Sequence, residues 1–283
     1  MKVWLDGKLV EQAQACVSVF DHGVLYGDGV FEGIRVYGGR IFECDAHMAR
    51  LEESARAIRL KIPYTRAELV AGMTAAIAAN GVRDGYIRLV VTRGPGDLGL
   101  NPLLCKRGTV FIIADQIRLY PQEMYENGMA VVIAKTRRIN PDMLPPRVKS
   151  CNYLNNIMAR LEAVDAGAGE ALMLNSDGFV AEATGDNVFI VQRGTVATPP
   201  VEAGILIGVT RGVVLELCGK LGVPAQQRNL RPDDIYRADE CFLTGTAAEV
   251  IAVTRVDDKT IGSGKAGPVT LKLLAAFRER TRQ

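Results

Sequence analysis

Apolar and polar positions alternate along several short stretches of the chain, which predicts strands at those places. In the clearest stretch one face carries Val30, Glu32, Ile34 and Val36, and the other face carries Phe31, Gly33, Arg35 and Tyr37. Similar patterns predict strands over 86–92, 109–114 and 129–134, and a hairpin formed by 2–5 and 8–10. In the second half, 171–174 and 179–180 predict another hairpin, and 188–191 and 240–244 predict further strands.

Helical spacing of apolar residues predicts helices over about 45–60 and 65–80, with Asp45 as the cap of the first. Further helices are expected after Asn152, after Gly208 and from about Pro268 to the end. For the helix after Asn152 we expect a buried stripe made of Leu154, Ile157, Met158, Leu161 and Val164. The polar stretch 119–127 predicts a linker between domains over 1–118 and 128–283.

Composition limits the classes of function. The 283 residues are 48% hydrophobic and carry a formal net charge of +2, so no electrostatic case exists for nucleic acid or an anionic membrane. Six cysteines without CxxC spacing and only two histidines argue against a metal site and a disulfide framework. No signal peptide and no membrane-spanning apolar run are expected, which predicts a soluble cytoplasmic protein.

One lysine, Lys149, stands between Pro145-Pro146 and the start of a predicted helix. The positive end of a helix dipole disfavours an ammonium, so the pKa of such a lysine can fall below its usual ~10.4. A lowered pKa is one route to a nucleophilic or Schiff-base amine. Most lysines are solvated surface charges, and the position alone does not separate the two interpretations.

Other polar residues suggest what this lysine could serve. The turns Gly208-Val209-Thr210 and Gly245-Thr246-Ala247 expose backbone N–H groups as anion sites do, although an ordinary helix cap is the alternative. Arg88 alternates with apolar residues, and a core-facing arginine is costly unless it binds an anion. Glu182 is either a solvated loop carboxylate or a buried acceptor for a cation. A reactive lysine, phosphate turns and a buried carboxylate together describe pyridoxal phosphate binding.

The sequence as a whole resembles the fold-type IV pyridoxal-phosphate enzymes: branched-chain aminotransferases, D-amino-acid aminotransferases and aminodeoxychorismate lyases. Seven motifs in the same order carry the resemblance: Tyr26-Gly-Asp-Gly-Val-Phe-Glu-Gly-Ile-Arg35, His47-xx-Arg50-Leu51, Tyr86-Ile-Arg88, Lys149-Ser-x-Asn-Tyr153, Glu182-xx-Gly-x-Asn187, Gly208-Val-Thr-Arg211 and Gly245-Thr-Ala-Ala-Glu249. The resemblance implies a two-domain α+β fold like that of D-amino-acid aminotransferase. It has a small N-terminal α/β domain and a larger, β-barrel-like C-terminal domain.

The resemblance also implies roles for individual residues, with pyridoxal 5′-phosphate as cofactor and no metal. Lys149 would be the catalytic Schiff-base lysine, Glu182 would face the pyridine nitrogen, Tyr153 would bond the ring oxygen, and Leu206 would pack on the ring. The phosphate would be held by Arg50, Val209, Thr210 and Thr246. Spacing alone leaves Arg50 and Arg56 open, and the resemblance selects Arg50. The substrate would be bound by Tyr26, Phe31, Gly33, Tyr86, Arg88, Thr246 and Ala247.

The activity implied is transamination between L-branched-chain amino acids and 2-oxoglutarate through a Lys149 aldimine. The family is typically dimeric, so a homodimer or higher homo-oligomer is expected, with the loop around 98–102 reaching the partner's site. A D-amino-acid aminotransferase is the nearest alternative, because Lys-Ser-x-Asn also occurs there, although no histidine follows Arg88. Aminodeoxychorismate lyase and a non-catalytic cofactor-binding relative are the other two.

Overall fold

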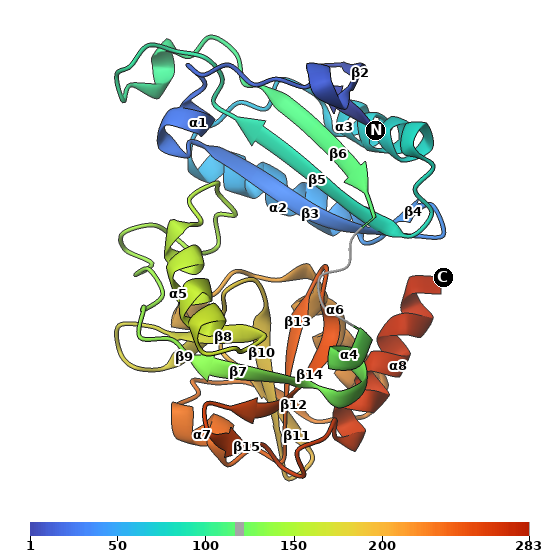
Figure 1. Cartoon of the computed structure of the whole chain (residues 1–283), viewed down its shortest axis with the longest axis vertical. Helices are drawn as coiled ribbons and strands as arrows, with labels where there is room; N and C mark the ends of the chain where they lie inside the picture. The colour runs from blue at the N-terminus through green and yellow to red at the C-terminus, as the bar shows by residue number, and fades with distance from the viewer. Residues whose placement is uncertain (117–121, 283) are drawn as a thin grey trace. The chain divides into compact units, whose positions relative to one another are not determined.

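The protein, described by a computed structural model for residues 1–116 and 122–282, folds into two compact units (Figure 1). The first unit combines the described part of Met1–Ile117 with Val148–Asn152, and the rest forms the second. Of the predicted linker, 119–121 lie outside the described residues and 122–127 form helix α4 (Gln122–Asn127). Within the described ranges, no helix combines the length and apolar character needed to cross a membrane.

Six strands form an antiparallel sheet in the first unit, in the order β2-β1-β6-β5-β3-β4. The strands are β1 (Lys2–Leu5), β2 (Lys8–Glu11), β3 (Gly29–Tyr37), β4 (Arg40–Ile41), β5 (Gly85–Thr92) and β6 (Val110–Asp115). The predicted N-terminal hairpin and the three predicted strands of this half are confirmed. Two-residue turns at Asp6-Gly7 and Gly38-Gly39 connect β1 to β2 and β3 to β4. The φ angles at these turns are positive, which suits glycine.

The helices of the first unit are α1 (His22–Tyr26), α2 (Cys44–Ala57) and α3 (Arg66–Asn80), with 3-10 turns at Gln12–Gln14 and Pro102–Leu104. Helix α3 begins with a capping box between Thr65 and Glu68 and ends at Gly81, which adopts a left-handed conformation. The predicted cap of α2 is wrong. Glu43, at φ 47°, turns the chain into the helix ahead of Asp45, and no side chain of the described residues caps α2.

Helices α2 and α3 pack against the sheet, and the core lies between them and its strands (Figure 1). Alternation along β3 and β5 directs Ile34, Ile87 and Leu89 into this core. Glu32 lies on the same face of β3 and is fully buried. The opposite face of the two strands therefore carries the residues of odd number in β3 and even number in β5, which include most of the predicted substrate residues.

The second unit contains a nine-stranded mixed sheet in the order β12-β11-β10-β13-β14-β7-β8-β9, with β15 paired to β14. The strands are β7 (Met129–Ile133), β8 (Glu170–Leu174), β9 (Val180–Ala183), β10 (Asn187–Gln192), β11 (Thr195–Thr198), β12 (Ala225–Gln227), β13 (Glu240–Gly245), β14 (Glu249–Val256) and β15 (Lys259–Thr260). Strand β9 also contacts β10, so the sheet curls on itself. This curled sheet agrees with the predicted barrel-like domain.

The remaining helices are α5 (Leu154–Asp165), α6 (Val209–Lys220), α7 (Pro232–Tyr236) and α8 (Pro268–Arg282), with a 3-10 turn at Val201–Ala203. Helices α6 and α8 pack against β13 and each other, and α5 packs against β7 and β8. The predicted helices in this half are therefore present.

The predicted buried stripe of α5 is wrong. Its five residues, Leu154, Ile157, Met158, Leu161 and Val164, are 50% to 69% exposed. The buried face instead consists of Asn156, Ala159 and Ala163, which lie against the sheet. Small side chains let a helix approach a sheet closely, and the large ones are left on the outer face. Helical periodicity identified the helix correctly but assigned the wrong face to the core.

Candidate active site

The backbone around Lys149 is attached to the first unit. The amide of Phe31 donates to the Lys149 carbonyl at 3.0 Å, and the amide of Cys151 donates to the Gly29 carbonyl at 2.9 Å. The Lys149 amide in turn donates to the Ser54 hydroxyl of α2 at 3.1 Å. Contacts with a strand and a helix thus fix the backbone of Lys149, as the role of a reactive group would require. The segment groups with 1–116, whereas the predicted boundary put it with 128–283.

Lys149 does not occupy the first turn of a helix. Helix α5 begins only at Leu154, with Tyr153 as its N-cap residue. The field of a helix N-terminus falls off within the first turn. Lys149 is therefore outside the reach of the α5 dipole, contrary to the expectation from the sequence, and its neighbours in the first unit determine its environment.

An aromatic ring lies beside the lysine. Nζ of Lys149 is 4.7 Å from the centroid of the Phe31 ring, and the guanidinium carbon of Arg88 is 4.6 Å from the same centroid. Arg88 pairs with Gly33 across the β3–β5 ladder. A Cβ at Gly33 would lie 1.7 Å from the Tyr86 hydroxyl, so only glycine leaves room for that tyrosine. Four predicted substrate residues therefore gather with Lys149 on one face of the sheet.

The expectation that Arg88 faces the core is wrong. Its neighbours Ile87 and Leu89 are fully buried, and the pleat of β5 directs Arg88 to the other face, where it is exposed. Its guanidinium stacks on Phe31 and lies 5.8 Å from the Tyr86 ring centroid. Stacking orients the arginine without a desolvation penalty. An exposed, oriented guanidinium of this kind suits a carboxylate ligand.

Arg50 forms a buried ion pair with Glu32. Nε and Nη2 of Arg50 donate to the two Glu32 oxygens at 2.8 Å and 2.7 Å, and Nδ1 of His47 lies 2.7 Å from Oε2. Burial raises the Glu32 pKa, but the charge and hydrogen bonds of Arg50, helped by His47, outweigh it and lower this pKa to about 2. Burial also lowers the pKa of His47 despite its acidic partner, so neutral His47 donates from Nδ1. Arg56, the other candidate, is exposed.

Glu182 is a buried acceptor rather than a solvated loop carboxylate. It lies within β9 and is 5% exposed. Arg138 Nε donates to Oε1 at 2.8 Å, and Oε2 accepts from the Leu206 amide at 2.9 Å and from Asn187 Nδ2 at 3.2 Å. All three partners are donors, which matches the ionised carboxylate. The second unit thus holds a fixed negative charge of the kind that keeps a pyridinium nitrogen protonated.

The side chains of the dipeptide Asp186-Asn187 pack against both predicted phosphate turns. A Cβ at Gly208 would lie 2.0 Å from Asn187 Oδ1, and a Cβ at Gly245 would lie 1.7 Å from Asp186 Oδ1. Gly208 is the N-cap of the 12-residue α6 and offers no side chain to its free N–H groups. Such an uncapped N-terminus binds anions readily.

A phosphate fits the donors present in these turns. Val209 and Thr210 open α6, and Thr246 follows β13 directly. Within the described ranges, the buried Thr244 hydroxyl has no hydrogen-bond partner, and Thr244 pairs with Asn187 across the β10–β13 ladder. An unpartnered buried hydroxyl is uncommon in a folded protein and is expected where a ligand supplies the partner.

Fewer contacts describe the surroundings of the remaining predicted site residues. Tyr26, in α1, donates its hydroxyl to the Leu98 carbonyl, so it belongs with the 94–102 loop. Tyr153 and Ala247 are half-buried, and Tyr153 is the N-cap residue of α5. Sequence reasoning did not single out Arg138, Asp186 or Glu32. Only Glu32 left a signal, as a charged residue on the apolar face of a strand.

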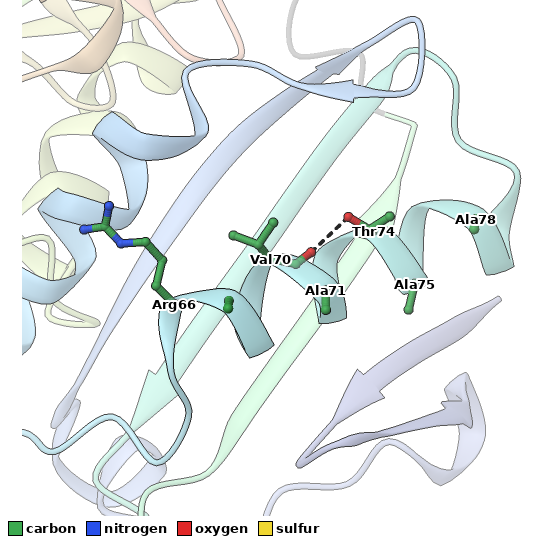
Figure 2. A pocket seen from close by; sticks show the side chains of 7 residues that line it. Arg66, Val70, Ala71, Thr74, Ala75 and Ala78 are labelled. Carbon is green, nitrogen blue, oxygen red and sulfur yellow. Dashed lines mark hydrogen bonds between the residues drawn. The ribbon is translucent and has the colours of Figure 1, made fainter.

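A surface depression on α3 is not a candidate site (Figure 2). Its volume is about 820 Å³, and small or apolar side chains of one helix line it. Arg66, the charged residue there, is already bound to Glu52 by two hydrogen bonds of 2.9 Å and 2.7 Å. Figure 2 shows the Thr74 hydroxyl bonded within the helix, to the Val70 carbonyl. The lining includes none of the predicted site residues.

Comparison with known proteins identifies the family. Residues 29–256 match the family model described as amino-transferase class IV. A Methanocaldococcus jannaschii protein provisionally named branched-chain-amino-acid aminotransferase is 46% identical, over 99% of this chain and 96% of its own length. D-alanine aminotransferase of Bacillus licheniformis is 37% identical, over 98% and 96%. A branched-chain amino acid aminotransferase of T.th., solved with pyridoxamine 5′-phosphate, superposes with a TM-score of 0.95 at 36% identity, covering 99% and 93%.

The chain belongs to the class IV aminotransferase family. This confirms the family and the two-domain α+β fold expected from the sequence. It also confirms that the protein is an aminotransferase whose cofactor is pyridoxal 5′-phosphate.

Proposed function

We propose that this protein transfers amino groups between L-branched-chain amino acids (leucine, isoleucine, valine) and 2-oxoglutarate. The observation that carries the proposal is the Phe31 ring flanked by Lys149 and Arg88, which places an apolar surface and a carboxylate-binding cation beside one amine. The T.th. relative has been solved with N-(5′-phosphopyridoxyl)-L-glutamate and with 4-methylvaleric acid, one ligand with an additional carboxylate and one with a branched apolar chain.

The bound cofactor supplies a ring that accepts electrons, and each of the residues around it has a separate role. Lys149 carries the cofactor and moves the proton at the substrate Cα, a positioned transfer of the kind that contributes about 10²–10⁴-fold to rate. Glu182 would hold the ring nitrogen in its protonated form, Tyr153 would bond the ring oxygen, and Leu206 would pack on the ring. Arg50, Val209, Thr210 and Thr246 would hold the phosphate.

Two kinds of substrate use one set of residues. Phe31, with Gly33 beside it, provides apolar surface for a branched side chain. Arg88 and Tyr86 receive the distal carboxylate of glutamate or 2-oxoglutarate. Tyr26 joins them if its hydroxyl turns from the Leu98 carbonyl, to which it donates in this structure, to that carboxylate. The backbone N–H groups of Thr246 and Ala247 receive the carboxylate common to both substrates.

Replacing Arg88 by leucine will separate the two substrates. We expect kcat/KM for glutamate to fall about 10–100-fold, since a hydrogen-bonded charge is worth about 1.5–3 kcal/mol, and that for leucine to change little. Steady-state kinetics with each donor measure this. Arg83→Leu, at an exposed position of the same unit, is the matched control. Intact glutamate activity together with impaired leucine activity would contradict the assignment.

The stereochemical alternative is carried by the similarity to a D-alanine aminotransferase and by Lys149-Ser-Cys-Asn. An assay of paired L- and D-amino acids with 2-oxoglutarate decides between them. Turnover of L-leucine but not D-alanine supports the proposal, and the reverse result replaces it. Release of pyruvate without any amino acceptor would instead indicate a lyase.

We also propose that the protein is a homodimer and that the outer face of α5 is part of the contact. Five apolar residues, each at least 50% exposed, line this face. Apolar residues gathered in this way on a surface mark interaction sites. Residues near Leu98–Leu100 are similarly exposed and are expected to lie near the partner's site.

Placing charges on that face will weaken the association. For Ile157→Asp with Leu161→Asp we expect the dimer dissociation constant to rise at least ~100-fold, because each side chain loses about 1.5–3 kcal/mol of burial. Light scattering over a range of concentrations measures it. Ala166→Asp, exposed just beyond the helix, should leave the dimer intact. A monomeric wild type would refute the homodimer, and an unaffected double variant would refute this face.

A further inference from the structure

We propose that Glu32, supported by His47, is a positioning residue that holds the Arg50 guanidinium in the orientation that binds the cofactor phosphate. This inference rests on the proposed function, in which Arg50 binds that phosphate. Glu32 itself touches neither cofactor nor substrate in this proposal, and it acts only through Arg50.

Glu32 accepts hydrogen bonds from both Arg50 and His47, and these bonds determine the orientation of the Arg50 guanidinium. Two parallel hydrogen bonds, from Nε and Nη2 of Arg50 to the two oxygens of Glu32, define the plane of the guanidinium. His47 precedes Arg50 by three positions on α2, so both side chains leave the same side of the helix and reach one carboxylate of β3. The Glu32 and His47 side chains are 0% and 1% exposed, and that of Arg50 is 10% exposed. The two hydrogen bonds and the low exposure of the three side chains leave the guanidinium little freedom to rotate.

Stability alone does not explain a carboxylate at this position. Glu32 lies between Val30 and Ile34 on the core face of β3, where both neighbours are fully buried. Burying an ion pair in such a place seldom stabilises a fold more than apolar residues of similar size would. A charged pair kept in an apolar core is therefore better explained by what it orients. Arginine held in a fixed fork geometry is the side chain best suited to a phosphate.

A second arginine–carboxylate pair in the same unit, Arg93 with the half-buried Asp28, lies outside the predicted site residues. Arg93 donates to both oxygens of Asp28 at 2.7 Å and 2.9 Å, with the same fork geometry. Its terminal nitrogens also donate to the carbonyls of Ile58 and Arg59, at 2.8 Å each. Arg93, which directly follows β5, thus connects the start of β3 to the end of α2. The Asp28–Arg93 pair provides a matched control for Glu32–Arg50.

The test compares affinity for pyridoxal 5′-phosphate with affinity for pyridoxal, which lacks the phosphate. Glutamine at position 32 keeps the shape but turns an N–H group toward Arg50, so at least one of the two bonds is lost. For Glu32→Gln we expect the Kd of pyridoxal phosphate to rise about 10–100-fold and that of pyridoxal to stay within about twofold. Asp28→Asn should lower Tm without changing the ratio of the two affinities. Absorbance titration of the 283-residue chain measures both constants.

Each other outcome decides the matter. An unchanged or larger preference for the phosphorylated ligand in Glu32→Gln overturns the inference, as does an equal loss of affinity for both ligands. If Glu32→Gln does not fold, His47→Gln removes only one bond to Glu32. It should show the same loss of preference at about 3–10-fold, and no loss would again overturn the inference. Failure of the wild-type chain to bind pyridoxal phosphate would instead refute the proposed function.

Discussion

Lys149→Ala will abolish transamination. We expect kcat with leucine and 2-oxoglutarate to fall at least ~10⁴-fold, because the change removes both the covalent attachment of the cofactor and the amine that moves the proton. The variant should fold, since the bonds that anchor this segment use the backbone of Lys149 and the Ser54 hydroxyl, not the lysine side chain. Kinetics and borohydride reduction followed by mass spectrometry of the protein measure the two losses separately.

The control is Lys220→Ala, which removes an exposed lysine at the end of α6 and should leave both readouts unchanged. A cofactor that is still fixed to the Lys149→Ala protein by borohydride would show that another lysine forms the attachment. Loss of turnover with attachment retained would likewise exclude Lys149 as the attachment point, although it would still be needed for the proton.

Much of the fold could be predicted because strands and helices leave local periodic patterns. The alternation over β3 identified the strand and even the face that Glu32 shares with Val30 and Ile34. The same logic failed for α5, because a pattern shows that a helix has an apolar side but not whether that side meets the sheet or the solvent. The buried face of α5 is made of Ala159, Ala163 and Asn156, which carry little hydrophobic signal.

The members of the candidate site could be proposed from the sequence, whereas the residues that support them could not. Lys149, Glu182 and the two glycine turns were found through the motifs around them, and spacing alone could not have assigned their roles. The Arg138–Glu182 pair spans 44 positions of sequence, and no local pattern connects its partners. Arg88 was placed in the core because its strand neighbours are apolar, whereas the pleat turns it to the other face. Partners brought together by the sheet are visible only in the folded chain.

Glu182→Gln will lower kcat by more than any loss of stability accounts for. We expect a loss of about 10²–10³-fold, the size seen when a preorganised electrostatic group is removed, because a neutral amide no longer favours protonation of the ring nitrogen. The cofactor's absorption spectrum and its dependence on pH should change together with kcat, since both report the protonation of the ring. Stopped-flow measurement of the half-reaction with leucine isolates the affected step.

Loss of a buried carboxylate could also lower activity by disturbing the fold, so the matched control is Glu240→Gln. Glu240 is 7% exposed in the same unit and accepts from the Val269 and Thr270 amides at the start of α8, as Glu182 accepts from the Leu206 amide. If the activity loss came from the fold, both variants would lose Tm and kcat in proportion. If Glu182 acts on the ring, Glu240→Gln lowers Tm with an unchanged cofactor spectrum, whereas Glu182→Gln shifts the spectrum at any given stability. An unshifted spectrum in Glu182→Gln would remove this residue from the chemistry and leave it a structural partner of Arg138.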